Sequence, residues 1–109
     1  MNPQKIIDEM TRRIAVRFHP QSIILFGSYS RGTAGPDSDV DLLVVFKDFK
    51  DAAPRRRRTV EIYQLLAGIG ISKDVIVVDE DEVRRLRSVP GTMIKEALDQ
   101  GKVLYGKVA

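Results

Sequence analysis

Apolar residues in two long stretches recur every three or four positions, the spacing of an amphipathic helix. The first stretch predicts a helix over residues 3–18, with Asn2 as its cap and Pro3 in its first turn, ending before Pro20. The second predicts a helix over residues 54–66 whose buried stripe comprises Val60, Tyr63, Leu66 and Ala67. Each helix is expected to place one face against a core.

Short apolar runs rich in Ile and Val alternate with these helices. They predict buried strands at residues 22–26 and 39–46 and further strands at 73–78 and 103–105. Two short helices, capped by Asp79 and Thr92, are expected to extend to about Arg87 and to Asp99. Helices interleaved with strands define an α/β (α+β) fold class, in which a mixed β-sheet is flanked by helices.

Length and composition narrow the class of protein. At 109 residues the chain is expected to form a single domain, residues 1–109. It has no cysteine, which excludes disulfides, thiolate catalysis and cysteine-ligated zinc and is compatible with a reducing compartment. No stretch approaches the roughly 18 apolar residues of a membrane span, and the N-terminus lacks a signal-peptide core. We therefore expect a cytoplasmic protein without membrane contact.

A glycine turn follows the first predicted strand directly. Gly27 permits a close approach of the backbone, and N–H groups at Gly27 and Ser28 could point at an anion. Ser30 and Arg31 lie in the same loop, where a hydroxyl and a guanidinium could bind triphosphate oxygens. The alternatives are an ordinary strand-ending turn and a surface position for Arg31. The loop lacks the lysine of a P-loop and the spacing of a dinucleotide-binding fingerprint.

Two aspartates open the second predicted strand. Asp39 and Asp41 are one residue apart, so both side chains leave the same face, with Cα atoms roughly 6.5 to 7 Å from each other. Their repulsion is about 2 to 3 kcal/mol at an effective dielectric near 20, and a cation between them would relieve it. Oxygen ligands favour Mg²⁺, which is completed by water and substrate phosphates. The alternative is a pair of acids that solvate the start of the strand.

A third acid, Asp74, lies near the start of the third predicted strand. It could complete a metal shell, or accept a proton from an attacking hydroxyl as a general base, a role worth roughly 10²- to 10⁴-fold in rate. The alternative is a solvated surface acid. Strand pairing could bring Asp74 and the Asp39–Asp41 pair to the same end of a sheet, beside Gly27.

The run from Gly27-Ser28 through ten residues to Asp39-Val40-Asp41 resembles the signature of the DNA polymerase β-like nucleotidyltransferase superfamily. In length the chain is similar to the minimal nucleotidyltransferases of bacteria and archaea. The resemblance implies ATP or another nucleoside triphosphate held by Gly27 and Ser28, two Mg²⁺ ions held by Asp39 and Asp41, and Asp74 as the third carboxylate. The reaction would be attack on the α-phosphorus with release of pyrophosphate.

Members of this family are often antitoxins of two-gene toxin–antitoxin modules. Their partner is a small helical toxin of the HEPN type, and some members add AMP to a tyrosine of that partner. The resemblance therefore implies a protein adenylyltransferase that works as an antitoxin. Two alternatives are a non-catalytic nucleotide-binding antitoxin that acts by complex formation, and a transferase that modifies a small molecule or an RNA end. A homo- or hetero-oligomer is compatible with the short chain.

The net charge of +3 comes from one cluster, Arg55 to Arg58, without which acidic residues outnumber basic ones by one. Four cations in the first turns of a helix oppose the helix dipole and repel one another. The run is read either as a solvated helix face or as a contact with RNA or an acidic partner surface. The single histidine, His19, precedes Pro20 and is read as a turn residue without a functional role.

Overall fold

Four strands form one mixed sheet in the computed structural model, which describes residues 2–49 and 52–108. The strands are β1 (Ser22–Phe26), β2 (Val40–Phe46), β3 (Lys73–Asp79) and β4 (Lys102–Gly106). Their order across the sheet is β3-β2-β1-β4, in which β2 and β3 are parallel and β1 is antiparallel to both of its neighbours. The predicted strands are confirmed, but β2 begins at Val40 and not at Asp39, β3 ends one residue later than predicted, and β4 is one residue longer at each end.

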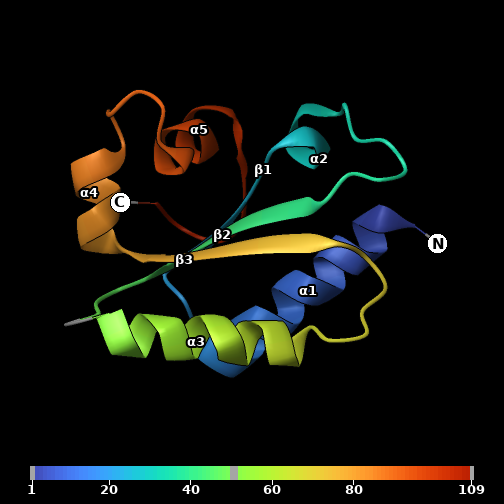
Figure 1. Cartoon of the computed structure of the whole chain (residues 1–109), viewed down its shortest axis with the longest axis horizontal. Helices are drawn as coiled ribbons and strands as arrows, with labels where there is room; N and C mark the ends of the chain where they lie inside the picture. The colour runs from blue at the N-terminus through green and yellow to red at the C-terminus, as the bar shows by residue number, and fades with distance from the viewer. Residues whose placement is uncertain (1, 50–51, 109) are drawn as a thin grey trace.

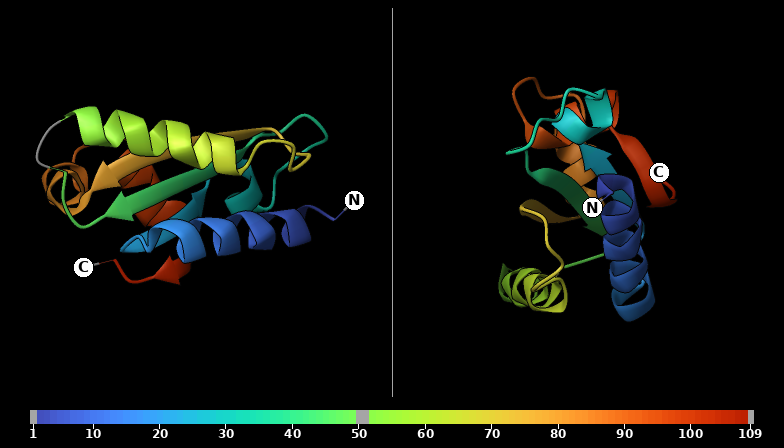
Figure 2. Two further views of the ribbon diagram at one scale, coloured as in Figure 1. Left: turned by 90° about the horizontal axis from the view of Figure 1, so that it is seen from below. Right: turned by 90° about the vertical axis from the view of Figure 1, so that its right-hand side faces the viewer.

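Helices cover both faces of the sheet (Figure 1). They are α1 (Pro3–Phe18), α2 (Ser28–Arg31), α3 (Ala52–Leu65), α4 (Glu80–Leu86) and α5 (Met93–Gln100). Figure 2 shows α1 and α3 on one face, and α2, α4 and α5 toward the other. The mixed sheet flanked by helices confirms the predicted fold class. Within the described part of the chain, no helix has the length and apolar character needed to cross a membrane.

From Leu42 to Phe46, strand β2 is buried on both faces, as the apolar sequence after Asp41 predicts. Leu42 and Val44 pack into the core beneath α1 and α3. Leu43 and Val45 pack into a second core beneath α4 and α5. Each such side chain contributes roughly 1.5 to 3 kcal/mol of burial free energy, so the strand is rigidly held. Its polar first residues therefore extend from a fixed support.

The predicted helix caps are confirmed. The Asn2 side chain accepts a hydrogen bond from Gln4 N at 2.9 Å, and the Asp79 side chain accepts one from Glu82 N at the same distance. Thr92 caps α5 in the same way, at 3.2 Å from Lys95 N. His19 ends α1 in the left-handed conformation, with φ of 47°, which agrees with its reading as a turn residue.

The buried face of α3 differs from the predicted stripe. Val60 is 55% exposed and Ala67 lies beyond the end of the helix, whereas Ile62 and Leu66 are fully buried. The prediction is confirmed for Leu66 and for Tyr63, which packs against the core, and wrong for Val60 and Ala67. The inward face of α3 runs from Arg55 and Arg58 to Ile62, so it begins with two cations, which an apolar stripe does not reveal.

The arginine run is divided between two environments. The Arg58 guanidinium lies over the rings of Phe18 and Phe46, at 4.9 and 4.8 Å from their centroids. The Arg55 guanidinium lies over Phe49 and forms ion pairs with acids of β3 and α4. Contacts of this kind stabilise a cation at a partly desolvated site. Arg56 and Arg57 are exposed, so only half of the run is a solvated face.

Candidate active site

The acids of β2 and β3 share one face and one end of the sheet. Because Leu42 and Val75 pack beneath α1 and α3, the alternating neighbours Asp41 and Asp74 leave the opposite face. The parallel register places Asp41 directly beside Asp74. Asp39, two residues before Asp41, extends the same alternation beyond the start of β2. The structure thus brings the three predicted acids to one rim, as the sequence predicts.

Gly27 lies against the carboxylate of Asp41. A Cβ atom at Gly27 would be 2.1 Å from Oδ2 of Asp41, far inside van der Waals contact. The backbone of Gly27, with φ of 75° and ψ of −155°, occupies a region that is almost restricted to glycine. Phe26 pairs with Asp41 across the β1–β2 ladder, which explains why the following residue meets the acid. Only glycine can fill this position without moving Asp41.

The turn after Gly27 continues into the four-residue helix α2, which begins at Ser28. The backbone N–H groups of Ser30 and Arg31 donate to the Gly27 carbonyl, each at 3.1 Å. In any helix the first N–H groups have no partner within the helix, and they can receive an anion. In this loop those groups belong to Ser28 and its neighbour Tyr29, beside the acids.

Ser30 and Arg31 contact α5, which the sequence does not predict. The Ser30 hydroxyl donates to the carbonyl of Gln100 at 2.8 Å, so its proton ties α2 to the end of α5. We correct the expectation for Ser30 accordingly, because in this arrangement its hydroxyl cannot also donate to a phosphate. Arg31 lies 3.8 Å from Glu96, with both side chains about half exposed. A pair this exposed is weak and leaves Arg31 able to exchange partners.

The carboxyl of Asp41 lies in an environment that disfavours its charge. Burial raises the pKa of Asp41 above its ordinary value, and the charges of Asp74, Asp39 and Glu96 raise it further. Arg31 acts in the opposite direction and lowers this pKa, but its effect is the smallest of the five. Like charges gathered at a half-buried position bind a cation favourably, because the cation removes the repulsion.

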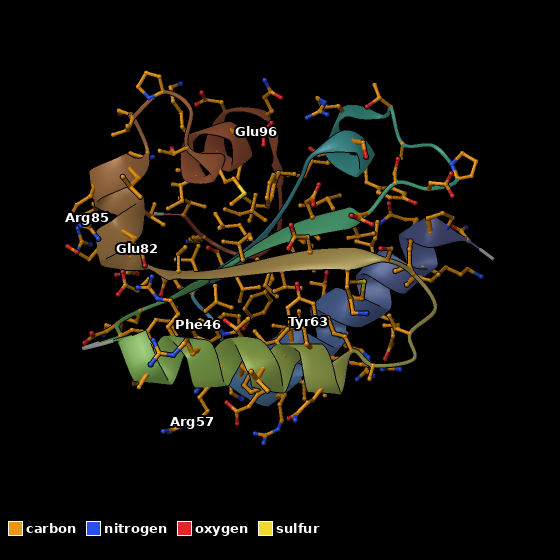
Figure 3. All side chains as sticks on the ribbon, in the orientation of Figure 1. Phe46, Arg57, Tyr63, Glu82, Arg85 and Glu96 are labelled. Atoms are coloured by element: carbon orange, nitrogen blue, oxygen red, sulfur yellow. The ribbon has the colours of Figure 1, made fainter. Side chains whose placement is uncertain are left out.

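Two residues near the acids were missed by the sequence analysis. Tyr63, which the helical pattern assigned to an apolar stripe, places its hydroxyl 3.4 Å from Oδ1 of Asp74. Glu96 on α5 contributes to the field at Asp41. A tyrosine in an apolar stripe is itself a signal, since a buried hydroxyl requires a hydrogen-bond partner. Figure 3 shows Tyr63 between α3 and β3, and Glu96 on the far side of the sheet.

The acids fit a divalent cation that is completed by its substrate. Among residues 2–49 and 52–108, no three His, Asp or Glu side chains form a group that could hold a metal ion, so Asp39, Asp41 and Asp74 do not make the expected three-acid metal site. Mg²⁺ requires no such cage, because it retains water and binds one or two carboxylates together with phosphate oxygens. Asp39 and Asp41, with the raised pKa at Asp41, provide a donor set of this kind.

A cavity of about 710 Å³ opens next to the acid rim. Its lining includes Ser38 and Ser72, which immediately precede the segments that carry Asp39 and Asp74. The rest of its wall comes from Tyr29, from Pro3 and Ile6 of α1 and from residues 34–37 and 70–71, and none of the three acids lines it. A volume of this size is typical of a small-molecule site.

Paired acids on a rigid strand, a third acid in register and a glycine turn instead of a P-loop define the nucleotidyltransferase class. Residues 4–103 match the family model described as nucleotidyltransferase domain. The chain belongs to this family, and it is a nucleotidyltransferase.

Relatives and solved structures place the chain more closely within the family. The protein adenylyltransferase MntA of Shewanella oneidensis is 38% identical over 86 residues, which cover 79% of this chain and 54% of that protein. The chain thus spans about half the length of this relative. MntA of Thermococcus cleftensis, also a protein adenylyltransferase, is 33% identical over 75 residues, which cover 68% of this chain and 72% of that one.

Among solved structures, a toxin–antitoxin complex with AMP-PNP has a TM-score of 0.55 at 29% identity, and the match covers 97% of this chain and 75% of that one. A tri-AMPylated HEPN toxin of Shewanella oneidensis in complex with its MNT antitoxin matches with a TM-score of 0.54 at 27% identity. That match covers 95% of this chain and 72% of the other.

Proposed function

We propose that this chain transfers AMP from ATP to a hydroxyl of a protein partner, and that the partner is a small helical toxin of the HEPN type. The observation that carries the proposal is the meeting of Asp41 and Asp74 in register beside a glycine whose missing side chain leaves room for Asp41. The relatives named protein adenylyltransferase and the AMPylated toxin complex support the choice of group and acceptor.

The proposal assigns a role to the glycine turn, to Arg31 and to each of the three acids. Backbone N–H groups at Gly27 and Ser28 orient the triphosphate, and Arg31 contributes positive charge to it. Asp39 and Asp41 would hold two Mg²⁺ ions, which would neutralise charge on the phosphates. Asp74 accepts the proton of the attacking hydroxyl. The acceptor oxygen bonds to the α-phosphorus, the bond from that phosphorus to the β-phosphate oxygen breaks, and pyrophosphate leaves.

The setting of the reaction is also part of the proposal. A single catalytic domain that draws on ATP would act in the cytoplasm, next to its partner. Any contact of the arginine run with RNA or with an acidic partner surface would rest on Arg56 and Arg57, because Arg55 and Arg58 are engaged within the protein.

The test is transfer of label from α-labelled ATP with Mg²⁺ to the product of the neighbouring gene. We expect a labelled partner with the native chain and no label with the double variant Asp39→Asn, Asp41→Asn. Toxin neutralisation without any label on the partner would instead favour a non-catalytic antitoxin. Label on a small molecule or an RNA end would overturn the choice of acceptor.

A further inference from the structure

Tyr63 contacts the proposed general base, Asp74. It extends from α3 on one side of the sheet to the outer edge of β3, where its hydroxyl meets two polar groups (Figure 3). Val75 N donates to this hydroxyl at 2.8 Å, and the hydroxyl lies 3.4 Å from Oδ1 of Asp74.

The first of these contacts fixes the direction of the second. Strand β3 is an edge strand, so the outward N–H of Val75 has no neighbouring strand to receive it. The Tyr63 oxygen accepts that hydrogen bond, which uses one of its lone pairs. A phenol has a single proton to give, and the carboxylate of Asp74 is the acceptor within reach. The hydroxyl therefore donates to Asp74.

A held orientation matters because the Asp74 side chain is exposed, so packing does not restrict its rotamer. Its neighbour on β2 is Asp41, and the two carboxylates repel each other, which pushes Asp74 toward the outer edge of β3. The Tyr63 hydroxyl lies at that edge, so its hydrogen bond acts in the same direction as the repulsion and selects one orientation of the Asp74 carboxylate.

We propose that Tyr63 is a positioning residue that keeps the Asp74 carboxylate turned toward the acceptor hydroxyl. The inference rests on the proposed role of Asp74 as the base in AMP transfer. It assigns to Tyr63 no contact with ATP, since Tyr63 acts only through Asp74. The consequence is that loss of its hydroxyl impairs proton transfer and leaves nucleotide binding intact.

The variant Tyr63→Phe removes the hydroxyl and keeps the ring that packs against the core. We expect kcat for AMP transfer to fall about tenfold, a typical cost of losing a group that orients a reactive residue. KM for ATP should stay within about twofold, because the groups that bind ATP are unchanged. Tyr105→Phe, the same change on the exposed strand β4, should leave both constants at native values.

A double-mutant cycle separates positioning from a general loss of stability. If Tyr63 acts through Asp74, adding Tyr63→Phe to Asp74→Asn should cause no further loss of activity, because the group it orients is gone. Additive losses would overturn the proposal. An unchanged kcat in Tyr63→Phe would also overturn it, and so would AMP attached to Tyr63 itself, which would make this tyrosine an acceptor.

A readout independent of activity distinguishes this inference from the proposed function. The carboxyl ¹³C resonance of Asp74, assigned by its loss in Asp74→Asn, should move in Tyr63→Phe and remain in place in Tyr105→Phe. A native chain that transfers no AMP would refute the proposed function even if this resonance moves. An unmoved resonance refutes the contact, and with it the role of Tyr63, whether or not the chain is active.

Discussion

The parallel strands β2 and β3 have acidic residues at both ends, and the surroundings of these acids differ between the two ends. At one end lie Asp41 and Asp74, whose mutual repulsion contributes to the raised pKa of Asp41. At the other end the buried Asp79 receives N–H groups from α4 and from Phe49, and an ion pair 3.8 Å long from Arg55. Arg55 also forms an ion pair with Glu82, which Figure 3 shows at the foot of α4.

This difference indicates that the acids at the Arg55 end stabilise the fold, whereas Asp39, Asp41 and Asp74 are available to bind a ligand. In the described part of the chain, no ion pair reaches Asp39, Asp41 or Asp74, whereas the acids at the opposite end have Arg55. A buried acid that serves only structure is neutralised by hydrogen bonds and a cation. Acids left without a cation at a rim destabilise the unliganded protein and gain most when Mg²⁺ and a nucleotide bind.

The largest loss of AMP transfer is expected when the negative charges of Asp39 and Asp41 are removed. Asp39→Asn with Asp41→Asn should lower AMP transfer by roughly 10³-fold, because metal stabilisation of the phosphates is worth several kcal/mol. Rates with α-labelled ATP measure this loss. Asp48→Asn, at the other end of β2, is the matched control and should transfer at the native rate. Equal losses in both variants would contradict the assignment.

Gly27→Ala should cause the second-largest loss in the rate of AMP transfer. The new methyl group would occupy the position of the Asp41 carboxylate and force that acid aside, which we expect to cost roughly 10²-fold in transfer rate. Gly32→Ala is the matched control, since Gly32 shares the φ of 75° and has no atom within 4 Å of the added group. Comparable rates for the two alanine variants would contradict the importance of the contact between Gly27 and Asp41.

A substitution at the Arg55 end of the sheet should lower the stability of the fold and leave the rate of AMP transfer unchanged. Arg55→Met leaves Asp79 and Glu82 without their cation and should lower the free energy of unfolding by about 1 to 3 kcal/mol. Urea denaturation measures the change. Arg56→Met, on the exposed face, should stay within about 0.5 kcal/mol of native. A similar loss in both variants would mean that Arg55 has no special role.

The smallest expected effect is on stability, and it is a gain and not a loss. Since the folded state raises the pKa of Asp41 above 3.8, ionising this group costs stability as pH rises through the interval between the unfolded and folded values. Asp41→Asn should therefore stabilise the unliganded chain slightly at pH 7 and raise its Tm. The gain should vanish below the ordinary carboxyl pKa. Destabilisation at pH 7 would contradict the reading of Asp41 as a strained acid.

Much of the fold and part of the site follow from local pattern alone. The strand runs, the caps at Asn2 and Asp79 and the convergence of the acids depend on spacing and alternation, which the sequence displays. The inward position of Arg58 does not follow from local pattern, because it depends on the ring of Phe18, which a distant segment contributes. Tyr63 and Glu96 were missed because their effects on the acids depend on how α3 and α5 pack against the sheet, which residue spacing within each helix does not show.

The central claim is that nucleotide and metal meet at the Asp39–Asp41–Asp74 rim and not at the Arg55 end. Paramagnetic Mn²⁺ added with a non-hydrolysable ATP analogue to ¹⁵N-labelled protein tests this directly by line broadening. We predict broadening centred on residues 27–28, 39–41 and 73–75, with residues 79–82 unaffected. Broadening centred on residues 79–82, or none that depends on the nucleotide, would contradict the account.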